Sequence, residues 1–241
     1  MSRTRKEEQH HAIREEIKAA ARELMAQEGS SGLSIRAIGR MMEMTAPALY
    51  HYYPSREALI TDLILDAFNS LGEQVEGTRD LHADEPAPSQ LLAVCLAYRQ
   101  WALDHPTDFA LIYGTPIPGY VAPGQKTVPA ASRSYLTFVS ILARALESGE
   151  IQPPDWLRDP PAEQQAAMRR LAEPYQQMGL DFPLNAHYMT AVGWTRMHGV
   201  IMLELFNHLQ PVVGDVDAFY RLQLEEMFRA FGLKRQAAPG P

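Results

Sequence analysis

Apolar residues recur at three- and four-residue intervals along most of the chain, which is the periodicity of one face of a helix. The first stripe predicts a helix over residues 9–28 and consists of Ile13, Ile17, Ala21 and Leu24. Residues 1–8 are polar and expected to be disordered, and Gly29 and Gly32 end the helix. No stretch alternates between apolar and polar residues as a strand does. The fold class is therefore predicted to be all-α.

Two short helices joined by a tight turn are predicted between residues 34 and 53. Ser34 is a good N-cap residue, and apolar residues follow it at helical spacing. Thr45 is a second N-cap, and Pro47 fits the first helical turn because its missing N–H costs nothing there. The second helix is therefore expected to start at Thr45.

The second of these helices has two unlike faces. Leu49 and Tyr53 are four residues apart and share a face that is expected in a core. The other face is small and contains a proline, a phenol and an imidazole, from Ala46, Pro47, Tyr50 and His51. Such a surface suits close approach to a DNA major groove.

Further helices are predicted in the rest of the chain, separated by segments rich in proline, glycine or acidic residues. The predicted helices are 56–77, 90–104, 108–113, 132–148, 162–178, 184–209 and 215–231. The predicted connections are 78–89, 114–130 and 149–160, and the tail after Leu233 is expected to be disordered. This pattern predicts two domains, 1–54 and 55–241.

Composition points to an ordinary globular protein of 241 residues, with 46% apolar and 21% charged residues. We expect no membrane-spanning segment and no signal peptide, and the single Cys95 fits a reducing, cytoplasmic location. The net charge is -7, but residues 1–54 hold eight basic and seven acidic side chains and so carry +1. The remainder carries -8, an asymmetry that is weak support for a DNA-facing N-terminal part.

The pattern SIRAIGRMMEMTAPALYHYYPSREALI resembles the TetR/AcrR family of bacterial transcriptional regulators. The match with its preceding helix spans about 50 residues. It rests on Ser34, Ile38-Gly39, Met44-Thr45, Leu49-Tyr50-His51-Tyr52-Tyr53 and Arg56-Glu57-Ala58-Leu59. One departure is Glu43, in the turn where the family usually has glycine. A non-glycine residue in a left-handed turn is mildly strained, and this one adds a negative charge near the expected phosphates.

A second, shorter motif, Gly193-Trp194-Thr195-Arg196-Met197-His198-Gly199, is similar to the Trp-x-x-x-His-Gly signature of one class of TetR-family C-terminal domains. The resemblance implies an N-terminal helix-turn-helix domain and a larger helical domain for ligand binding and dimerisation. It also implies a homodimer that binds double-stranded operator DNA and releases it when a small-molecule effector binds.

The resemblance further implies roles for single residues. Phosphate contacts are expected from Arg36, Tyr50, His51 and Arg56, and base-edge contacts from Ala46, Pro47 and Ala48, next to the capping Thr45. The alternative for Tyr50 and His51 is that they only cover the hydrophobic face. Few polar base readers are present, so specificity is expected to depend on thymine methyl contacts and DNA shape.

Aromatic and soft side chains of the larger domain are the candidates for a ligand pocket: Trp101, Phe109, Tyr113, Phe138, Trp194, Met197 and His198. They suit an apolar or aromatic ligand with a few polar anchors. The alternative is that each one is an ordinary core residue, with His198 a hydrogen-bonded core histidine.

The last two helices are predicted to form the dimer surface. One is apolar almost all round, and the other carries a stripe of Tyr220, Leu224, Met227, Phe228 and Phe231. The alternative is burial of both helices within one subunit.

Catalytic and metal-binding functions find little support in the sequence. No His/Cys cluster has ligand spacing, and Gly-rich phosphate loops and nucleophile-elbow motifs are absent. Adjacent acidic residues such as Glu225 and Glu226 point apart on a helix. We therefore expect a non-enzyme without cofactor or metal. One alternative remains, a DNA-binding regulator whose C-terminal domain binds a protein partner instead of a metabolite.

Overall fold

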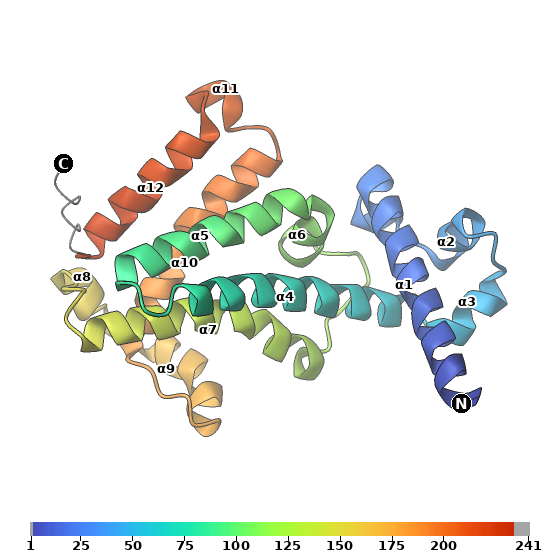
Figure 1. Cartoon of the computed structure of the whole chain (residues 1–241), viewed down its shortest axis with the longest axis horizontal. Helices are drawn as coiled ribbons and strands as arrows, with labels where there is room; N and C mark the ends of the chain where they lie inside the picture. The colour runs from blue at the N-terminus through green and yellow to red at the C-terminus, as the bar shows by residue number, and fades with distance from the viewer. Residues whose placement is uncertain (1, 234–241) are drawn as a thin grey trace. The chain divides into compact units, whose positions relative to one another are not determined.

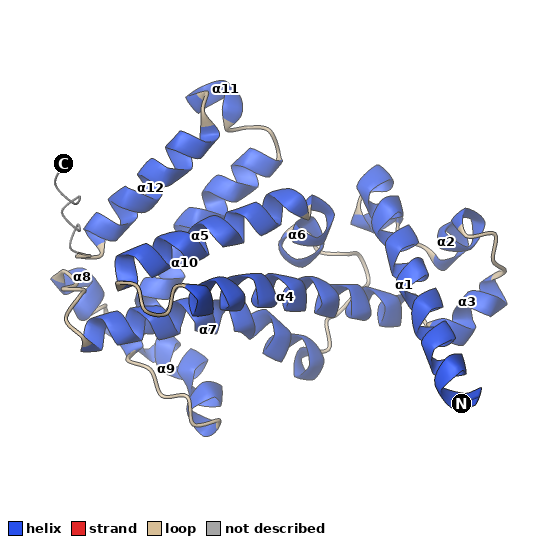
Figure 2. Ribbon diagram, in the orientation of Figure 1, coloured by secondary structure: helices blue, strands red, loops and turns tan. Residues whose placement is uncertain are grey.

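A computed structural model of the chain describes residues 2–233. Within this range the structure is helical, without a named strand (Figure 2). It contains one isolated antiparallel bridge, between Ile151 and Leu233. The all-α prediction is confirmed. The α-helices are α1 (Ser2–Glu28), α2 (Ile35–Met41), α3 (Ala46–Tyr52), α4 (Arg56–Leu81), α5 (Ala87–Asp104), α6 (Pro106–Tyr113), α7 (Gly124–Glu147), α8 (Asp155–Arg158), α9 (Ala162–Gln177), α10 (Leu184–Leu205), α11 (Gln210–Val213) and α12 (Val216–Ala230) (Figure 1).

Side-chain caps set the starts of the three helices that follow α1. The hydroxyl of Ser34 accepts a hydrogen bond from the Ala37 N–H at 3.2 Å, and that of Thr45 accepts one from the Ala48 N–H at 3.4 Å. Ser55 caps α4 in the same way, at 3.1 Å from the Ala58 N–H. Each bond satisfies a backbone donor that has no partner inside the helix. The predicted starts of these helices are confirmed.

Three predicted helix boundaries are wrong: the start of α1, the end of α4 and the start of α5. Residues that favour helix extend these helices into segments that were predicted to be irregular. The segment before residue 9 is not disordered over its described part, since α1 begins at Ser2 and its Arg, Lys, Glu and Gln residues are good helix formers. The connection predicted at 78–89 shrinks, because α4 runs to Leu81 and α5 begins at Ala87. The tail after Leu233 lies outside the described residues.

The proline-rich connections also contain helix. Helix α7 begins at Gly124 inside the segment predicted to be a loop, with Pro129 within the helix. Pro129 removes one hydrogen bond, to the carbonyl of the exposed Gln125, and water can satisfy an exposed carbonyl. The short helix α8 lies within the connection predicted at 149–160.

The helices form two compact units. Unit 1 comprises Met1–Ser70 with Asp104–Ala131, and unit 2 comprises Leu71–Leu103 with Ser132–Pro241. The three boundaries along the chain fall inside α4, at the end of α5 and inside α7. Unit 1 thus contains the segment predicted as the domain 1–54, together with the start of α4, α6 and the start of α7.

Unit 1 has one hydrophobic core. Its centre consists of residues no more than 3% exposed, namely Ile17, Ala21, Leu24, Leu33, Ile38, Leu49, Tyr53, Leu59, Ile60 and Leu63. Leu111 of α6 and Ile117 of the following loop pack against it. The three-helix arrangement around α2 and α3 is therefore held by α4 and by the α6 region, which the sequence had assigned to the other domain.

Candidate DNA-binding surface and ligand cavity

The turn between α2 and α3 is short and closely packed. The Met44 N–H donates to the Gly39 carbonyl at 2.9 Å, and Glu43 adopts a left-handed conformation with φ 54°. A Cβ at Gly39 would lie 2.8 Å from the Met44 carbonyl oxygen, so only glycine fits without a shift of the backbone. Glu43 is thus confirmed in the left-handed turn where its residue type is unfavourable.

Helix α3 has one buried and one exposed face, as the sequence predicts. Leu49 and Tyr53 are 1% and 2% exposed, whereas Tyr50 is 50% exposed and His51 is also exposed. The three residues predicted to face the bases differ in exposure. Pro47 is exposed, whereas Ala46 and Ala48 are half-buried. Half of the Tyr50 side chain remains open to solvent, so only the other half can cover the hydrophobic face.

The imidazole of His51 lies in a small cluster of rings. Its centroid is 5.3 Å from that of Tyr52 and 5.9 Å from that of His10 in α1, and the His10 and Tyr52 rings are 4.8 Å apart. These contacts restrict the orientation of His51 at the surface of α3. No pattern in the sequence indicated a role for His10.

An open depression lies beside the turn, and its wall includes two exposed arginines one helical turn apart on α2, Arg36 and Arg40. The residues around it are Arg36, Gly39, Arg40, Glu43, Met44, Thr45 and Ala46. Arg36 was a predicted phosphate contact. Arg40 was missed, although its four-residue spacing from Arg36 was a usable signal. Two cations here suit a phosphate backbone, and Glu43 reduces the positive charge.

Arg56 has a structural contact that its predicted role did not include. Its Nε donates to the Leu33 carbonyl at 2.6 Å, which ties the start of α4 to the segment that leads into α2. Arg56 therefore positions α2 whether or not it also contacts a phosphate.

A ladder of ion pairs joins α1 to α4 and α6. Arg14, Lys18 and Arg22 are four residues apart, so they lie along one face of α1. They pair with the carboxylates of α4 and α6 at 2.8 Å (Arg14–Asp62), 2.5 Å (Lys18–Asp66) and 2.9 Å (Arg22–Asp108). The four-residue spacing within α1 and between Asp62 and Asp66 is the sequence signal of this ladder.

Tyr53 links the buried face of α3 to this ladder. Its hydroxyl donates to Asp62 at 2.6 Å, and the guanidinium of Arg14 lies 4.6 Å from its ring centroid. Partial burial alone would raise the pKa of Asp62, but the hydrogen bonds from Tyr53 and Arg14 outweigh it and hold that pKa below its usual range. The carboxylate is thus kept charged, and α3 is held against α1 and α4.

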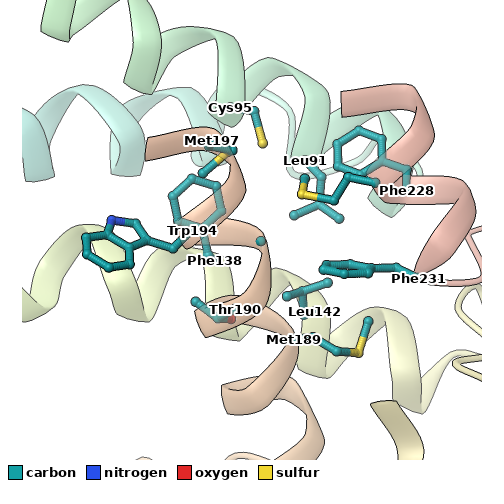
Figure 3. Close-up of a pocket in the computed structure, with 12 residues that line it drawn as sticks. Leu91, Cys95, Phe138, Leu142, Met189, Thr190, Trp194, Met197, Phe228 and Phe231 are labelled. Carbon is teal, nitrogen blue, oxygen red and sulfur yellow. The ribbon is translucent and has the colours of Figure 1, made fainter. Parts of the chain in front are cut away.

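A narrow apolar cavity lies in unit 2 between α5, α7, α10 and α12 (Figure 3). Its cavity volume is small, about 20 Å³, little more than one water molecule needs. Its lining consists of Leu91, Cys95, Phe138, Leu142, Met189, Thr190, Gly193, Trp194, Met197, Met227, Phe228 and Phe231. Aromatic rings and thioethers dominate, so the cavity suits an apolar ligand that displaces flexible side chains.

Polar groups in this lining are few and mostly engaged. The Thr190 hydroxyl donates to the Ala186 carbonyl at 2.9 Å. Burial raises the pKa of the Cys95 thiol, which therefore stays protonated and unreactive.

The seven predicted ligand residues do not all meet at this cavity. Phe138, Trp194 and Met197 line it. His198 lies next to it, with its ring centroid 4.7 Å from that of Trp194 and its Nδ1 3.4 Å from the Tyr98 hydroxyl. Burial lowers the pKa of His198, which favours the neutral ring.

The other three predicted ligand residues lie elsewhere. Trp101 is buried in unit 2 but is not part of the lining. Phe109 and Tyr113 belong to unit 1, where their ring centroids are 5.2 Å apart and Tyr113 packs against Phe68. Sequence reasoning missed Met189, Met227, Phe228 and Phe231 as lining residues, because helical periodicity does not say which apolar faces leave space between them.

One side of the cavity is braced by a buried charge cluster. Arg99 of α5 is 8% exposed and binds both carboxylate oxygens of Glu204 in α10, at 2.8 and 2.7 Å. Its Nη1 also donates to Asp217 of α12 at 2.9 Å, and its guanidinium lies 5.1 Å from the ring centroid of Tyr220. The Tyr220 hydroxyl donates to the Cys95 carbonyl at 3.0 Å. These bonds join α5, α10 and α12 to one another. The same three helices line the cavity, together with α7.

The stripe on α12 that was predicted to face a second subunit is instead buried within unit 2. Tyr220, Leu224, Met227 and Phe231 are between 0% and 4% exposed, because they pack on α5 and α10 around the cavity. For these four residues the alternative of burial within one subunit is correct. The exposed apolar residues of the last helices are Leu203, Phe206, Val212 and Leu222.

Among residues 2–233, no helix is long and apolar enough to cross a membrane. Over the same range, no three His, Cys, Asp or Glu side chains lie close enough together to hold a metal ion.

Two family models match the chain. Residues 17–63 match the model for bacterial regulatory proteins of the tetR family, and residues 91–227 match the model for the tetracyclin repressor-like C-terminal domain. An HTH-type transcriptional regulator from Mycobacterium tuberculosis is 33% identical over 199 residues, which cover 80% of this chain and 82% of that protein.

Solved structures agree with these matches. The crystal structure of SCO4313, described as a regulatory protein, has a TM-score of 0.73 and 30% identity, with 92% of this chain and 98% of that chain covered. A TetR family transcriptional regulator from Thermus thermophilus shares the fold with a TM-score of 0.60 at 16% identity, over 91% of this chain and 99% of that one.

Proposed function

The chain belongs to the TetR family of bacterial transcriptional regulators, and on that premise we propose that it is a repressor that a small, largely apolar molecule releases from its operator. The observation that carries the proposal is the narrow cavity of unit 2, lined almost wholly by apolar side chains. A cytoplasmic location follows from this function, since the operator is chromosomal DNA.

On this proposal α3 enters the major groove. Ala46, Pro47 and Ala48, behind the capping Thr45, approach base edges, while Arg36, Tyr50, His51 and Arg56 contact phosphates. The exposure of Arg36, Tyr50 and His51 supports their part in this assignment. The 2.6 Å bond from Arg56 to the Leu33 carbonyl means that Arg56 contributes by positioning α2 as well.

Two helix glycines offer a sharp test of the effector cavity. A Cβ at Gly193 of α10 would lie 3.5 Å from Met227 and Phe231, an ordinary contact, so alanine fits there and occupies cavity space. Alanine at Gly77 of α4 meets nothing within 4 Å. Both substitutions remove a helix glycine and are expected to stabilise the protein by about 0.5–1 kcal/mol. Only Gly193→Ala is expected to weaken the response to effector.

A binding duplex is first selected from a random-sequence pool with the wild-type protein, and apolar compounds that bind the protein are found by thermal-shift screening. The measurement is the release of that duplex as each compound is titrated in. We expect Gly193→Ala to need at least several-fold more compound for half-release, and Gly77→Ala to match wild type. Equal responses of the two variants would place the effector outside this cavity. DNA binding that no small molecule affects would favour the protein-partner alternative.

We also propose a homodimer through the last helices. The single chain leaves Leu203 and Phe206 of α10 and Leu222 of α12 about half exposed, at 48%, 53% and 50%. Apolar side chains on neighbouring long helices are typical of a subunit interface.

Light scattering is expected to give twice the 27.0 kDa chain mass at micromolar concentration. Leu203→Glu/Phe206→Glu is expected to give monomers, because two buried charges facing their symmetry mates are costly. Leu81→Glu, at an 86% exposed position in α4, is the matched control and should remain dimeric. A monomeric wild-type protein would refute the dimer, and a dimeric double variant would move the interface elsewhere.

A further inference from the structure

His187 of α10 is fully buried but incompletely satisfied. Its relative exposure is 0%, and its Nε2 is the one buried side-chain nitrogen or oxygen without a hydrogen-bond partner among the described residues. A buried polar atom left unpaired is costly, typically about 1–3 kcal/mol. Such an atom calls for an occupant that the folded chain does not itself provide.

The other ring nitrogen decides what kind of occupant fits. The Tyr135 hydroxyl of α7 lies 3.0 Å from His187 Nδ1, closer than its 3.4 Å approach to the His187 carbonyl. When Tyr135 donates to Nδ1, the ring proton is on Nε2, which becomes a hydrogen-bond donor. Burial lowers the pKa of His187, outweighing the opposite effect of Asp181, so the ring is neutral. Nε2 therefore needs a neutral or weakly basic acceptor.

Three aromatic rings lie around the ring of His187. The Tyr175 ring is parallel to that of His187 within 9°, with centroids 6.4 Å apart, and the Tyr135 ring is inclined by 28° at 5.9 Å. Phe182 presents its ring at 65° and 6.2 Å. Aromatic pairs attract over about 4.5–7 Å, so the His187–Tyr175 pair is near the loose end of that range.

The helix that carries Tyr175, α9, buries few of its own side chains. Ala172 is the one buried residue of α9. Pro174 lies inside the helix immediately before Tyr175 and removes a backbone hydrogen bond there. A hydrogen bond of 2.7 Å between the hydroxyls of Tyr175 and Ser132 holds the ring in place. Moving the last turn of α9 would thus expose little apolar surface.

We propose that His187, Tyr135, Tyr175 and Phe182 form a second small-molecule site, which takes a planar ligand with a hydrogen-bond acceptor between the rings of α9 and α10. None of these four residues lines the cavity in Figure 3, so the site is distinct from the proposed effector cavity. The acceptor of the ligand pairs with Nε2–H, and the last turn of α9 shifts to admit its ring.

The test uses the full-length protein with ¹⁵N-labelled histidine, and quinoline and naphthalene as probes. The two probes have the same shape, but only quinoline has an acceptor. His187→Phe removes one imidazole signal and so identifies that of His187. We expect quinoline to shift the His187 Nε2 signal and to bind about 3- to 10-fold more tightly than naphthalene, the ratio that one net hydrogen bond supplies. Gly193→Ala should leave this shift unchanged.

A stability measurement checks the premise. His187→Phe/Tyr135→Phe replaces both partners by rings of similar shape and is expected to keep or raise the melting temperature of the free protein, while abolishing the preference for quinoline. A His187 signal that millimolar quinoline leaves unchanged, or equal affinity for both probes, would overturn the proposal. So would a clear fall in the melting temperature of the double variant, since Nε2 would then already be satisfied in the free protein.

Discussion

Arg99→Ala is expected to lower the free energy of unfolding of unit 2 by about 3–5 kcal/mol, the usual cost of removing one partner from a buried ion pair. The guanidinium is bound bidentately by Glu204, whose side chain is 15% exposed. Without Arg99, this carboxylate remains largely buried and unpaired. The contact of the guanidinium with the Tyr220 ring is lost as well.

Tryptophan fluorescence during urea denaturation measures this loss selectively, because Trp101, Trp156 and Trp194 all belong to unit 2. Arg221→Ala is the matched control. It removes only the exposed ion pair between Arg221 and Asp217, which are 2.9 Å apart, and should change stability little. Arg99→Met/Glu204→Met removes both charges together and should be far less destabilising than Arg99→Ala. If Arg99→Ala unfolds at the same urea concentration as Arg221→Ala, the cluster does not stabilise unit 2.

Arg36→Ala/Tyr50→Ala is expected to weaken operator binding by about 2–4 kcal/mol at each half-site, roughly 30- to 1000-fold, through loss of two phosphate contacts, one of them charge-assisted. Both side chains are exposed on the surface formed by α2 and α3 and contribute nothing to the core of unit 1. The stability of the variant should therefore remain close to that of the wild type.

Fluorescence anisotropy with the selected duplex, repeated between about 50 and 300 mM salt, measures the effect. The slope of log affinity against log salt should fall by about 0.9 for each phosphate that loses its cationic partner, so by about 1 for Arg36 on each half-site. Arg170→Ala, an exposed arginine on α9, controls for the general loss of one positive charge. Unchanged affinity and salt slope in the double variant would move the DNA-binding surface away from α2 and α3.

Much of unit 1 could be predicted because its signals are local. The hydroxyl caps Ser34 and Thr45 act within three residues of themselves, and the spacing of Leu49 and Tyr53 fixes which face of α3 is buried. The left-handed position of Glu43 likewise depends on a turn only a few residues long. Local geometry of this kind depends on the types of a few neighbouring residues and on their spacing.

Contacts between distant segments could not be predicted in the same way. Arg22 meets Asp108, 86 residues later, and Arg56 is turned toward the Leu33 carbonyl rather than fully toward solvent. A short helix at 108–113 was predicted, but nothing in its residues said that Leu111 packs on the core of unit 1. Helical periodicity shows which face of a helix is buried, but it does not identify the segment that packs against that face.

The sequence by itself determined the all-helical class, the capped helix pair at residues 34–53 and the family to which the chain belongs, because each depends on residue types at short, regular spacing. Tertiary structure alone decided which apolar side chains enclose space. It placed Phe138, Trp194 and Met197 at the cavity, put Phe109 and Tyr113 in unit 1, and buried most of the α12 stripe within the subunit. The reason is physical: close packing fills most of the interior, and a cavity or an unpaired atom such as His187 Nε2 remains only where crossing helices fail to complement each other.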